Sequence, residues 1–325
     1  MAYEKPHKNL NEQVAIMQDR GMDTGELKDA VAHLKRIGYY RLSAYSYPLR
    51  QWTGHGADAK RSETFIEGTT LDQVVKLHDF DRKIRTLLLD GLGQVEVGMR
   101  YAISYTLGKR DPYGHLNIDH LDGHQCNDPQ HRNDPSITRL EHWQARFDRR
   151  ISESRNEDFV RHFNEKYAGE MPIWVAAEVL DFGGLVSLHG LLKTEDKRDV
   201  ARSMGFEGAN TGHLHNHFVQ LNVLRNHCAH QSRIWNRQIV YRSPVSKLGK
   251  VPDSLKHLSS IPADNSNKLY TPAAVTAHIT EHLDPKCNWR RTFATQIKKM
   301  PQFSDRINYA TMGFPEGWAA EALWS

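Results

Sequence analysis

The chain has 325 residues, of which 39% are hydrophobic and 25% charged. This balance is typical of a globular protein with a core that needs no disulfide or metal. The sequence has no run of about 18 apolar residues, which argues against a membrane protein. The N-terminus lacks the apolar core of a signal peptide, and the cysteines are few and odd in number. We therefore expect a cytoplasmic protein with reduced thiols.

The charge balance gives a weak indication of a nucleic-acid partner. The net charge is +4, arginine outnumbers lysine 25 to 18, and there are 19 histidines. Guanidinium groups bind phosphate well and imidazoles titrate near neutral pH, so this composition suits phosphate contact and proton transfer. A composition bias without chemical purpose explains the same numbers equally well.

The first 110 residues show apolar residues mostly at helical spacing. The expected elements are helices over 10–20 and 24–37, a tyrosine-rich joint closed by Pro48, a loop over 51–70, and one long helix over 71–109. Thr70 and Gln73 are placed to form a capping box at the start of the long helix. A bend is expected at Gly91–Gly93.

The remaining residues continue the helical pattern, so the predicted class is all-α. The expected elements are a loop over 111–135, helices over 137–167, from Pro172 (interrupted at Gly183–Gly184), over 195–204 and over 213–238, and helices near 272–283 and 288–299. The best strand candidate is 237–242. We expect an N-terminal segment (1–70), a helical core (71–242) and a C-terminal helical extension (243–325) that together form one compact unit.

The densest polar cluster lies in the expected helix around 224–237. A helical projection places one polar face opposite an apolar stripe. That polar face carries Asn222, Asn226, His230, Arg233 and Arg237, with Arg225 at its edge. Solvated helix faces usually include glutamate, lysine or aspartate, and this face has none. Its imidazole, amides and guanidinium groups suit a phosphodiester and proton transfer better than a divalent metal, which prefers carboxylates or clustered imidazoles.

The Arg-x4-His spacing is not specific by itself. It occurs at Arg50/His55, Arg110/His115 and Arg225/His230, where chance predicts about 1.5 occurrences for this composition. The first two pairs enclose turn sequences. Only the third pair falls on an amphipathic helix and has an asparagine directly after the arginine, so the context distinguishes it.

The segment RNHCAHQSRIWNR (225–237) resembles the signature of the Abi-like (AbiD/AbiF-type) family of bacterial abortive-infection proteins, whose helical core belongs to the HEPN ribonuclease superfamily. Four other segments fit the same family: 38–49, 79–100, 174–188 and 312–318. The resemblance implies a HEPN-like helical bundle with N- and C-terminal helical extensions. It also implies metal-independent RNA cleavage, in which the ribose 2′-hydroxyl attacks the adjacent phosphorus and leaves 2′,3′-cyclic phosphate and 5′-hydroxyl ends.

The resemblance also implies roles for the polar face. Arg225 would neutralise charge on the reacting phosphate, His230 would transfer protons, and Asn226 would orient the imidazole or a substrate hydroxyl. The expected RNA-binding residues are Arg233, Arg237 and Arg41. One histidine cannot easily act as both acid and base, and HEPN enzymes commonly face two motifs across a dimer, so a homodimer is implied.

Two carboxylates have open roles. Glu178 lies in an otherwise apolar stretch, so we expect it to be buried and paired with an arginine. It forms either a structural salt bridge or a support that positions Arg225, and the structural role is favoured. The pair Glu96 and Arg100 leaves the same two interpretations open.

The resulting hypothesis is a toxin-like anti-phage ribonuclease that acts on RNA without a metal or other cofactor. An RNA or protein regulator is an expected partner, and a membrane is not. The alternative is a non-catalytic RNA-binding or interaction protein that uses the same basic helix. Alternating histidines at 213, 215 and 217 and the histidines near Cys126 suggest metal binding only weakly, because the first group is expected on a helix and the second in a loop.

Overall fold

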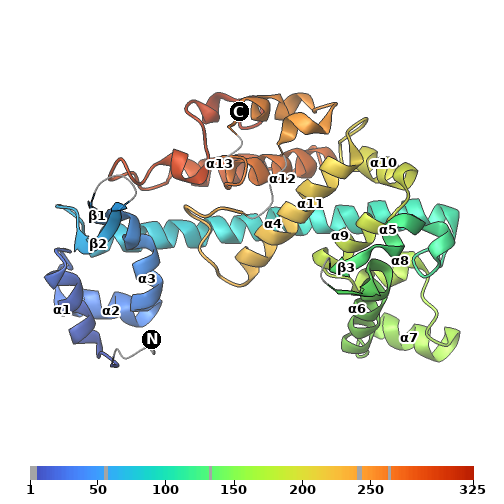
Figure 1. Cartoon of the computed structure of the whole chain (residues 1–325), viewed down its shortest axis with the longest axis horizontal. Coiled ribbons are helices and arrows are strands. Elements are labelled where there is room, and N and C mark those ends of the chain that lie inside the picture. The colour runs from blue at the N-terminus through green and yellow to red at the C-terminus, as the bar shows by residue number, and fades with distance from the viewer. Residues whose placement is uncertain (1–5, 55–57, 132–133, 240–243, 263–264) are drawn as a thin grey trace.

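A computed structural model describes residues 6–54, 58–131, 134–239, 244–262 and 265–325. These residues are mostly helical, and the strands among them form two small two-stranded sheets. The predicted all-α class is therefore confirmed. Figure 1 shows an elongated molecule in which helix α4 (Leu71–Arg110) runs along the long axis.

Helix α4 is the element around which the other helices pack. It begins at the predicted capping box, in which Thr70 Oγ1 accepts from the Gln73 amide and Gln73 Oε1 accepts from the Thr70 amide. The helix continues for 40 residues through both Gly91 and Gly93. Its buried side chains recur at helical spacing, and they include Leu77, Ile84, Leu88, Val95 and Met99.

The N-terminal segment forms short helices and a hairpin at one end of α4 (Figure 1). Its elements are α1 (Leu10–Asp19), α2 (Leu27–Ile37), α3 (Tyr39–Ser46), the 3-10 turn η1 (Tyr47–Leu49), β1 (Arg50–Thr53) and β2 (Lys60–Phe65). The predicted helices over 10–20 and 24–37 are confirmed. The loop expected over 51–70 is wrong in part, because β1 and β2 pair antiparallel within it. The tyrosine-rich joint is helix α3, which contacts α4.

The central segment covers the other end of α4 (Figure 1). Its elements are η3 (Ile118–His120), α5 (Gly123–Asn127), β3 (Pro129–His131), β4 (Asp134–Thr138), α6 (Arg139–Glu153), α7 (Asp158–Tyr167), α8 (Ile173–Ala176), η4 (Ala177–Val179), α9 (Phe182–Leu191) and α10 (Thr194–Ser203). The loop expected over 111–135 therefore contains short elements.

Two predicted boundaries in this segment are wrong. The helix expected over 137–167 is divided into α6 and α7, because serine and asparagine at 154 and 156 favour helix caps over helix interiors. The interruption expected at Gly183–Gly184 falls earlier, where the Asp181 side chain caps α9 by accepting from the Gly184 amide at 2.8 Å. Both glycines lie inside α9. A Cβ on Gly183 would lie 2.8 Å from Nη2 of Arg146, so the missing side chain admits that guanidinium.

The C-terminal part returns along α4. Its elements are α11 (Thr211–Ala229), η5 (Val245–Leu248), η6 (Asp253–Ser260), α12 (Tyr270–Leu283), α13 (Trp289–Lys298), η7 (Tyr309–Met312) and η8 (Trp318–Ala320). Helices α11, α12 and α13 all contact α4, and the two predicted C-terminal helices are confirmed. The strand proposed over 237–242 is not formed at 237–239, and its last three residues lie outside the described residues.

Candidate active site at the end of helix α11

Helix α11 crosses α4 and ends near its middle (Figure 1). Asn210 caps its start by accepting from the Gly212 and His213 amides. The apolar stripe is fully buried, and its members are Leu214, Phe218, Leu221, Leu224 and Cys228. Burial raises the pKa of the Cys228 thiol to about 12, so this cysteine is a neutral core residue.

The helix ends at Ala229, so the helix expected over 213–238 is too long. Gln231 adopts a left-handed conformation with φ +55°. The Ser232 amide donates to the His227 carbonyl at 2.9 Å, and the Gln231 amide donates to the Cys228 carbonyl at 3.1 Å. These two bonds form a Schellman cap, which usually has glycine at the left-handed position. Because glutamine occupies that position here, the sequence carries no obvious stop signal.

The three predicted catalytic residues lie on the last turn and the cap of α11. Arg225 and Asn226 are half-buried, and Arg225 Nη1 lies 3.5 Å from Asn226 Oδ1. His230 is the C-cap residue, and its amide donates to the Asn226 carbonyl at 2.9 Å. Its side chain is exposed, and its imidazole forms no hydrogen bond or ion pair with any described residue. An exposed imidazole thus follows an arginine and an amide within five residues at this end of the helix.

Glu96 is the carboxylate that contacts Arg225. Its Oε2 lies 3.6 Å from Arg225 Nε, and its Oε1 lies 3.4 Å from Arg100 Nη2. The Glu96 side chain is 15% exposed, and that of Arg225 is 33% exposed. Glu96 therefore makes both of the contacts considered for it: a structural salt bridge with Arg100 and a contact that can position Arg225.

The environment of Glu178 differs from the buried one that the sequence predicts. Its side chain is 56% exposed, and it reaches Arg100 Nε only at 3.8 Å. The expected buried carboxylate is wrong because the residue lies in the short turn η4, where its side chain points to solvent. Arg100 instead donates to the carbonyls of Ala177 and Leu180, each at 2.9 Å, and thereby joins α4 to this turn.

A buried carboxylate on α4 holds the segment that follows His230. Asp81 accepts from the amides of Ile234 at 3.1 Å and Trp235 at 2.7 Å, and it pairs with Arg85. It also accepts from the Tyr45 hydroxyl at 2.6 Å, and burial raises the pKa of that phenol. Asp81 thus fixes the backbone just beyond the cap of α11.

Asp81 and Arg85 were missed by the sequence prediction. Their signal is an acidic and a basic residue four positions apart on the apolar stripe of α4, where charged side chains are uncommon unless paired. The same stripe carries the core leucines and valines, so the two charges could have been recognised as a buried pair.

The predicted RNA-binding arginines are only partly available. Arg233 donates to the Ala44 carbonyl, its guanidinium lies 5.9 Å from the centre of the Trp235 ring, and burial lowers its pKa. Arg41 donates to the Gln231 carbonyl at 2.7 Å. Neither Arg233 nor Arg237 lies on α11, so the continuous polar face expected beyond His230 is wrong. Arg237 is half-buried and has no hydrogen bond or ion pair within the described chain.

A second histidine lies beside His230. His227 is half-buried, and its pKa is lowered by burial first and then by the nearby guanidinium of Arg237 and imidazole of His230. Its Nε2 atom is buried without a hydrogen-bond partner among the described residues. The end of α11 therefore combines an exposed imidazole with a neighbouring one whose charged form is disfavoured by burial.

A small cavity adjoins the polar face of α11 one turn before the motif. Its volume is about 290 Å³, and it lies between α6, α9 and α11. Asn222 borders it from α11, together with Arg146 from α6. Arg146 also pairs with Asp181 at 2.7 Å. The polar surface that contains Arg225 and His230 thus extends by one helical turn, to Asn222 and Arg146, toward the start of α11.

The described residues form neither of the alternative metal sites. Among the described residues no three histidine, cysteine, aspartate or glutamate side chains lie close enough together to hold a metal ion. The side chains of His215 and His217 lie in the protein interior, and burial lowers the pKa of each to about 4. Within the same described ranges, no helix is both long and apolar enough to span a bilayer.

The fold and the site define an all-α protein with an arginine, an asparagine and a histidine at the exposed end of a core helix. The chain belongs to the Abi-like protein family, whose model matches residues 32–236. This membership associates it with abortive infection and antiviral defence. No curated protein and no solved structure matches the chain.

The family match covers α4, α11 and the turn that Asp81 holds. Three of the resembling segments outside the motif fall within it. The segment 312–318 and the helices α12 and α13 lie beyond it. The matched region therefore contains Arg225, Asn226 and His230 together with Glu96 and Asp81, which contact this end of the helix.

Proposed function

We propose that this protein is a metal-independent endoribonuclease that acts as a toxin-like effector of anti-phage abortive infection. One observation carries the proposal: Arg225, Asn226 and an exposed His230, which is unpartnered among the described residues, lie on the last turn and the cap of one helix, and Asp81 binds the segment that follows. Membership of the Abi-like family supports the defence role. A HEPN-type helical core over 71–242, extended by the segments on either side, is part of the same proposal.

The proposed reaction is transfer of the phosphodiester to the neighbouring 2′-oxygen. An imidazole takes the proton from the 2′-hydroxyl, the bond from the 2′-oxygen to phosphorus forms, and the bond from phosphorus to the 5′-oxygen breaks. The leaving oxygen takes a proton from an imidazolium. The products are a 2′,3′-cyclic phosphate and a 5′-hydroxyl, so neither water nor a redox partner is consumed.

Each residue has a role that its surroundings support. His230 transfers protons because its imidazole is exposed and unpartnered. Arg225 stabilises the negative charge that grows on the phosphorane oxygens, and pre-positioned charges of this kind contribute strongly to rate. Glu96 holds Arg225 from α4 and is a positioning residue. Asn226 orients the imidazole or a ribose hydroxyl.

RNA is the proposed substrate, and a second copy of the chain is the proposed partner. One His230 serves as base and the partner's His230 as acid, which is feasible because the cap of α11 is exposed. Arg237 is the best-placed of the three predicted RNA-binding arginines, since Arg41 and Arg233 already bind internal carbonyls. An RNA or protein regulator would bind over the same face.

Mapping of the RNA ends tests this function. RNA incubated with the purified protein in EDTA should be cut and should carry 2′,3′-cyclic phosphate and 5′-hydroxyl ends. Activity that requires Mg²⁺, or products with 5′-phosphates, would contradict the mechanism. Tight RNA binding without cleavage under all conditions would instead support the non-catalytic alternative.

A further inference from the structure

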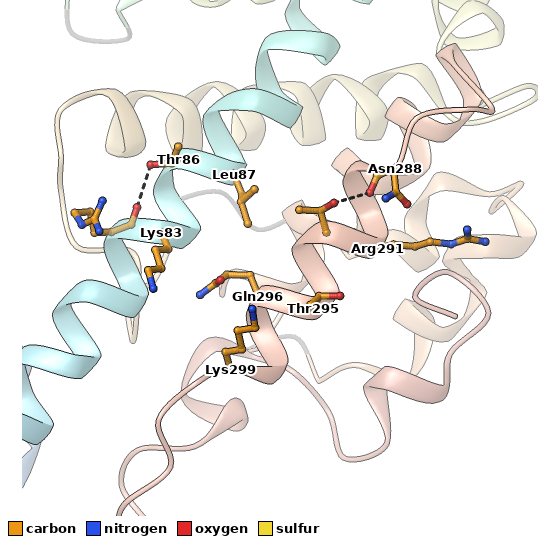
Figure 2. A pocket seen from close by; sticks show the side chains of 10 residues that line it. Lys83, Thr86, Leu87, Asn288, Arg291, Thr295, Gln296 and Lys299 are labelled. Atoms are coloured by element: carbon orange, nitrogen blue, oxygen red, sulfur yellow. Dashed lines mark hydrogen bonds between the residues drawn. The ribbon is translucent and has the colours of Figure 1, made fainter.

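A groove between α4 and α13 lies outside the candidate active site. Its volume is about 740 Å³, within the range of roughly 300–1,000 Å³ that small-molecule sites occupy. One wall comes from α4 and the other from α13, as Figure 2 shows. The second wall lies beyond the residues that the family model matches.

The groove follows from how the two helices meet. Trp289 at the start of α13 packs against Gly91, where a Cβ would lie 2.3 Å from the indole. The same indole donates to the Leu87 carbonyl at 2.7 Å. This close contact fixes one end of the groove. Lys83 and Lys299 lie toward the other end, on opposite helices (Figure 2).

The charge of the groove is its most unusual property. Four cationic side chains line it, namely Arg82, Lys83, Arg291 and Lys299, and none of the described residues that line it is acidic. Lys83, Arg291 and Lys299 form no ion pair within the described ranges. Arg82 lies 4.0 Å from Asp79, but Arg36 already binds that carboxylate at 2.8 Å.

The rest of the lining suits a ligand with both polar and apolar parts. Thr86 and Thr295 offer hydroxyl groups, and Leu87 offers an apolar surface between the helices. Phosphate groups would pair with the lysines and arginines, whereas a nucleobase and its sugar would contact Leu87 and the threonines. The volume also exceeds what a bare phosphate ion needs.

We propose that this groove is a binding site for a nucleotide, held through its phosphates by Lys83 and Lys299. The nucleotide is either a free molecule or one unit of an RNA strand, because both present the same phosphate, sugar and base. This site is separate from the Arg225–His230 site. Side chains two residues apart project from nearly opposite sides of a helix, so Lys83 faces the groove while Asp81 and Arg85 face the turn after α11.

Two neighbouring lysines give a matched test. Lys299, the C-cap residue of α13, lines the groove, whereas Lys298, the last residue of that helix, is exposed and does not line it. Lys299→Glu and Lys298→Glu therefore change the net charge equally. Both are made in full-length protein that also carries His230→Ala, so that an RNA probe survives. Calorimetry then measures the binding of ADP, of inorganic phosphate and of an eight-residue oligouridylate.

We expect ADP or the oligouridylate to bind, and Lys299→Glu to weaken that binding by about tenfold or more, the value of one charge-assisted contact. Lys298→Glu should leave it nearly unchanged, and Lys83→Glu should repeat the Lys299→Glu result. Binding of ADP that Lys299→Glu weakens assigns a free nucleotide. If ADP does not bind, oligouridylate binding that Lys299→Glu weakens assigns RNA, whereas oligouridylate binding that Lys299→Glu leaves unchanged takes place at the Arg225–His230 site and also overturns the proposal. The proposal is overturned if neither probe binds, if phosphate binds as well as ADP, or if both variants weaken binding equally. Because the experiment measures binding and not cleavage, its failure can be distinguished from a failure of the proposed ribonuclease function.

Discussion

Helix α11 carries histidines in both halves, but the two halves place them in opposite environments. In the first half His217 is fully buried, and His215 stacks on His189 with their Nδ1 atoms 3.0 Å apart. At the last turn His230 is exposed and unpartnered within the described chain. Burial holds the first group neutral, whereas the second can exchange protons with a bound molecule. Whether a histidine can take part in proton transfer therefore depends on its location, and the high histidine content of the chain does not indicate it.

The turn after α11 depends on Asp81, so its removal should have the largest effect on stability. Asp81→Ala leaves Arg85 buried without its acidic partner and two backbone amides without the carboxylate that binds them, which should cost about 3–5 kcal/mol in the free energy of unfolding. Chemical denaturation measures this loss.

Asp72 provides the control for Asp81 on the same helix. It pairs with Lys76 at 2.8 Å, but both side chains are largely exposed, so Asp72→Ala should cost less than about 1 kcal/mol. Equal losses for the two variants would show that Asp81 does not hold the turn.

The buried histidines predict how stability depends on pH. Burial lowers the pKa of His115, His215 and His217 to about 4. In the unfolded chain these imidazoles take up a proton at a higher pH than they do in the folded chain. The stability that their burial in the neutral form contributes is therefore present above about pH 6.5 and is lost as the pH falls toward 4. Each histidine accounts for roughly 3 kcal/mol of this change.

Single substitutions can separate these contributions. His217→Gln should remove one histidine's share of the pH dependence between about 6.5 and 4. His124→Gln should leave it unchanged, because that side chain is 82% exposed. Unfolding measured across this pH range checks both, and a wild-type protein whose stability does not fall on acidification would contradict the burial of these imidazoles.

Substitution of Glu96 should have a smaller effect than the substitutions above, and it should change the rate of cleavage rather than the stability of the fold. Glu96→Gln removes the charge that holds Arg225, so cleavage at saturating RNA should slow by roughly three- to tenfold while RNA affinity stays nearly constant. Glu178→Gln is the matched control, since its carboxylate is exposed and its ion pair among the described residues is with Arg100 alone. A loss of affinity, or equal slowing in both variants, would argue against a positioning role for Glu96.

The sequence predicts most of the helices because periodicity and capping are local properties. The capping box at Thr70 and the long helix it begins are examples. The end of α11 was not predictable in this way, because the left-handed residue is Gln231 and the contacts that hold the turn come from Asp81, about 150 positions earlier. Other long-range contacts engage Arg41, which binds the Gln231 carbonyl, and Arg233, which binds the Ala44 carbonyl, whereas the sequence alone leaves both free to bind RNA.

The most direct measurement compares His230→Ala with His124→Ala, an exposed histidine outside the site. Single-turnover cleavage and equilibrium RNA binding are measured for both variants and the wild type. His230→Ala should lower the cleavage rate by roughly 10²–10⁴, the usual contribution of a general acid–base group, and should leave RNA affinity nearly unchanged. His124→Ala should match the wild type in both. Undiminished cleavage by His230→Ala would contradict the account, and so would a loss of affinity that by itself explains the slower cleavage.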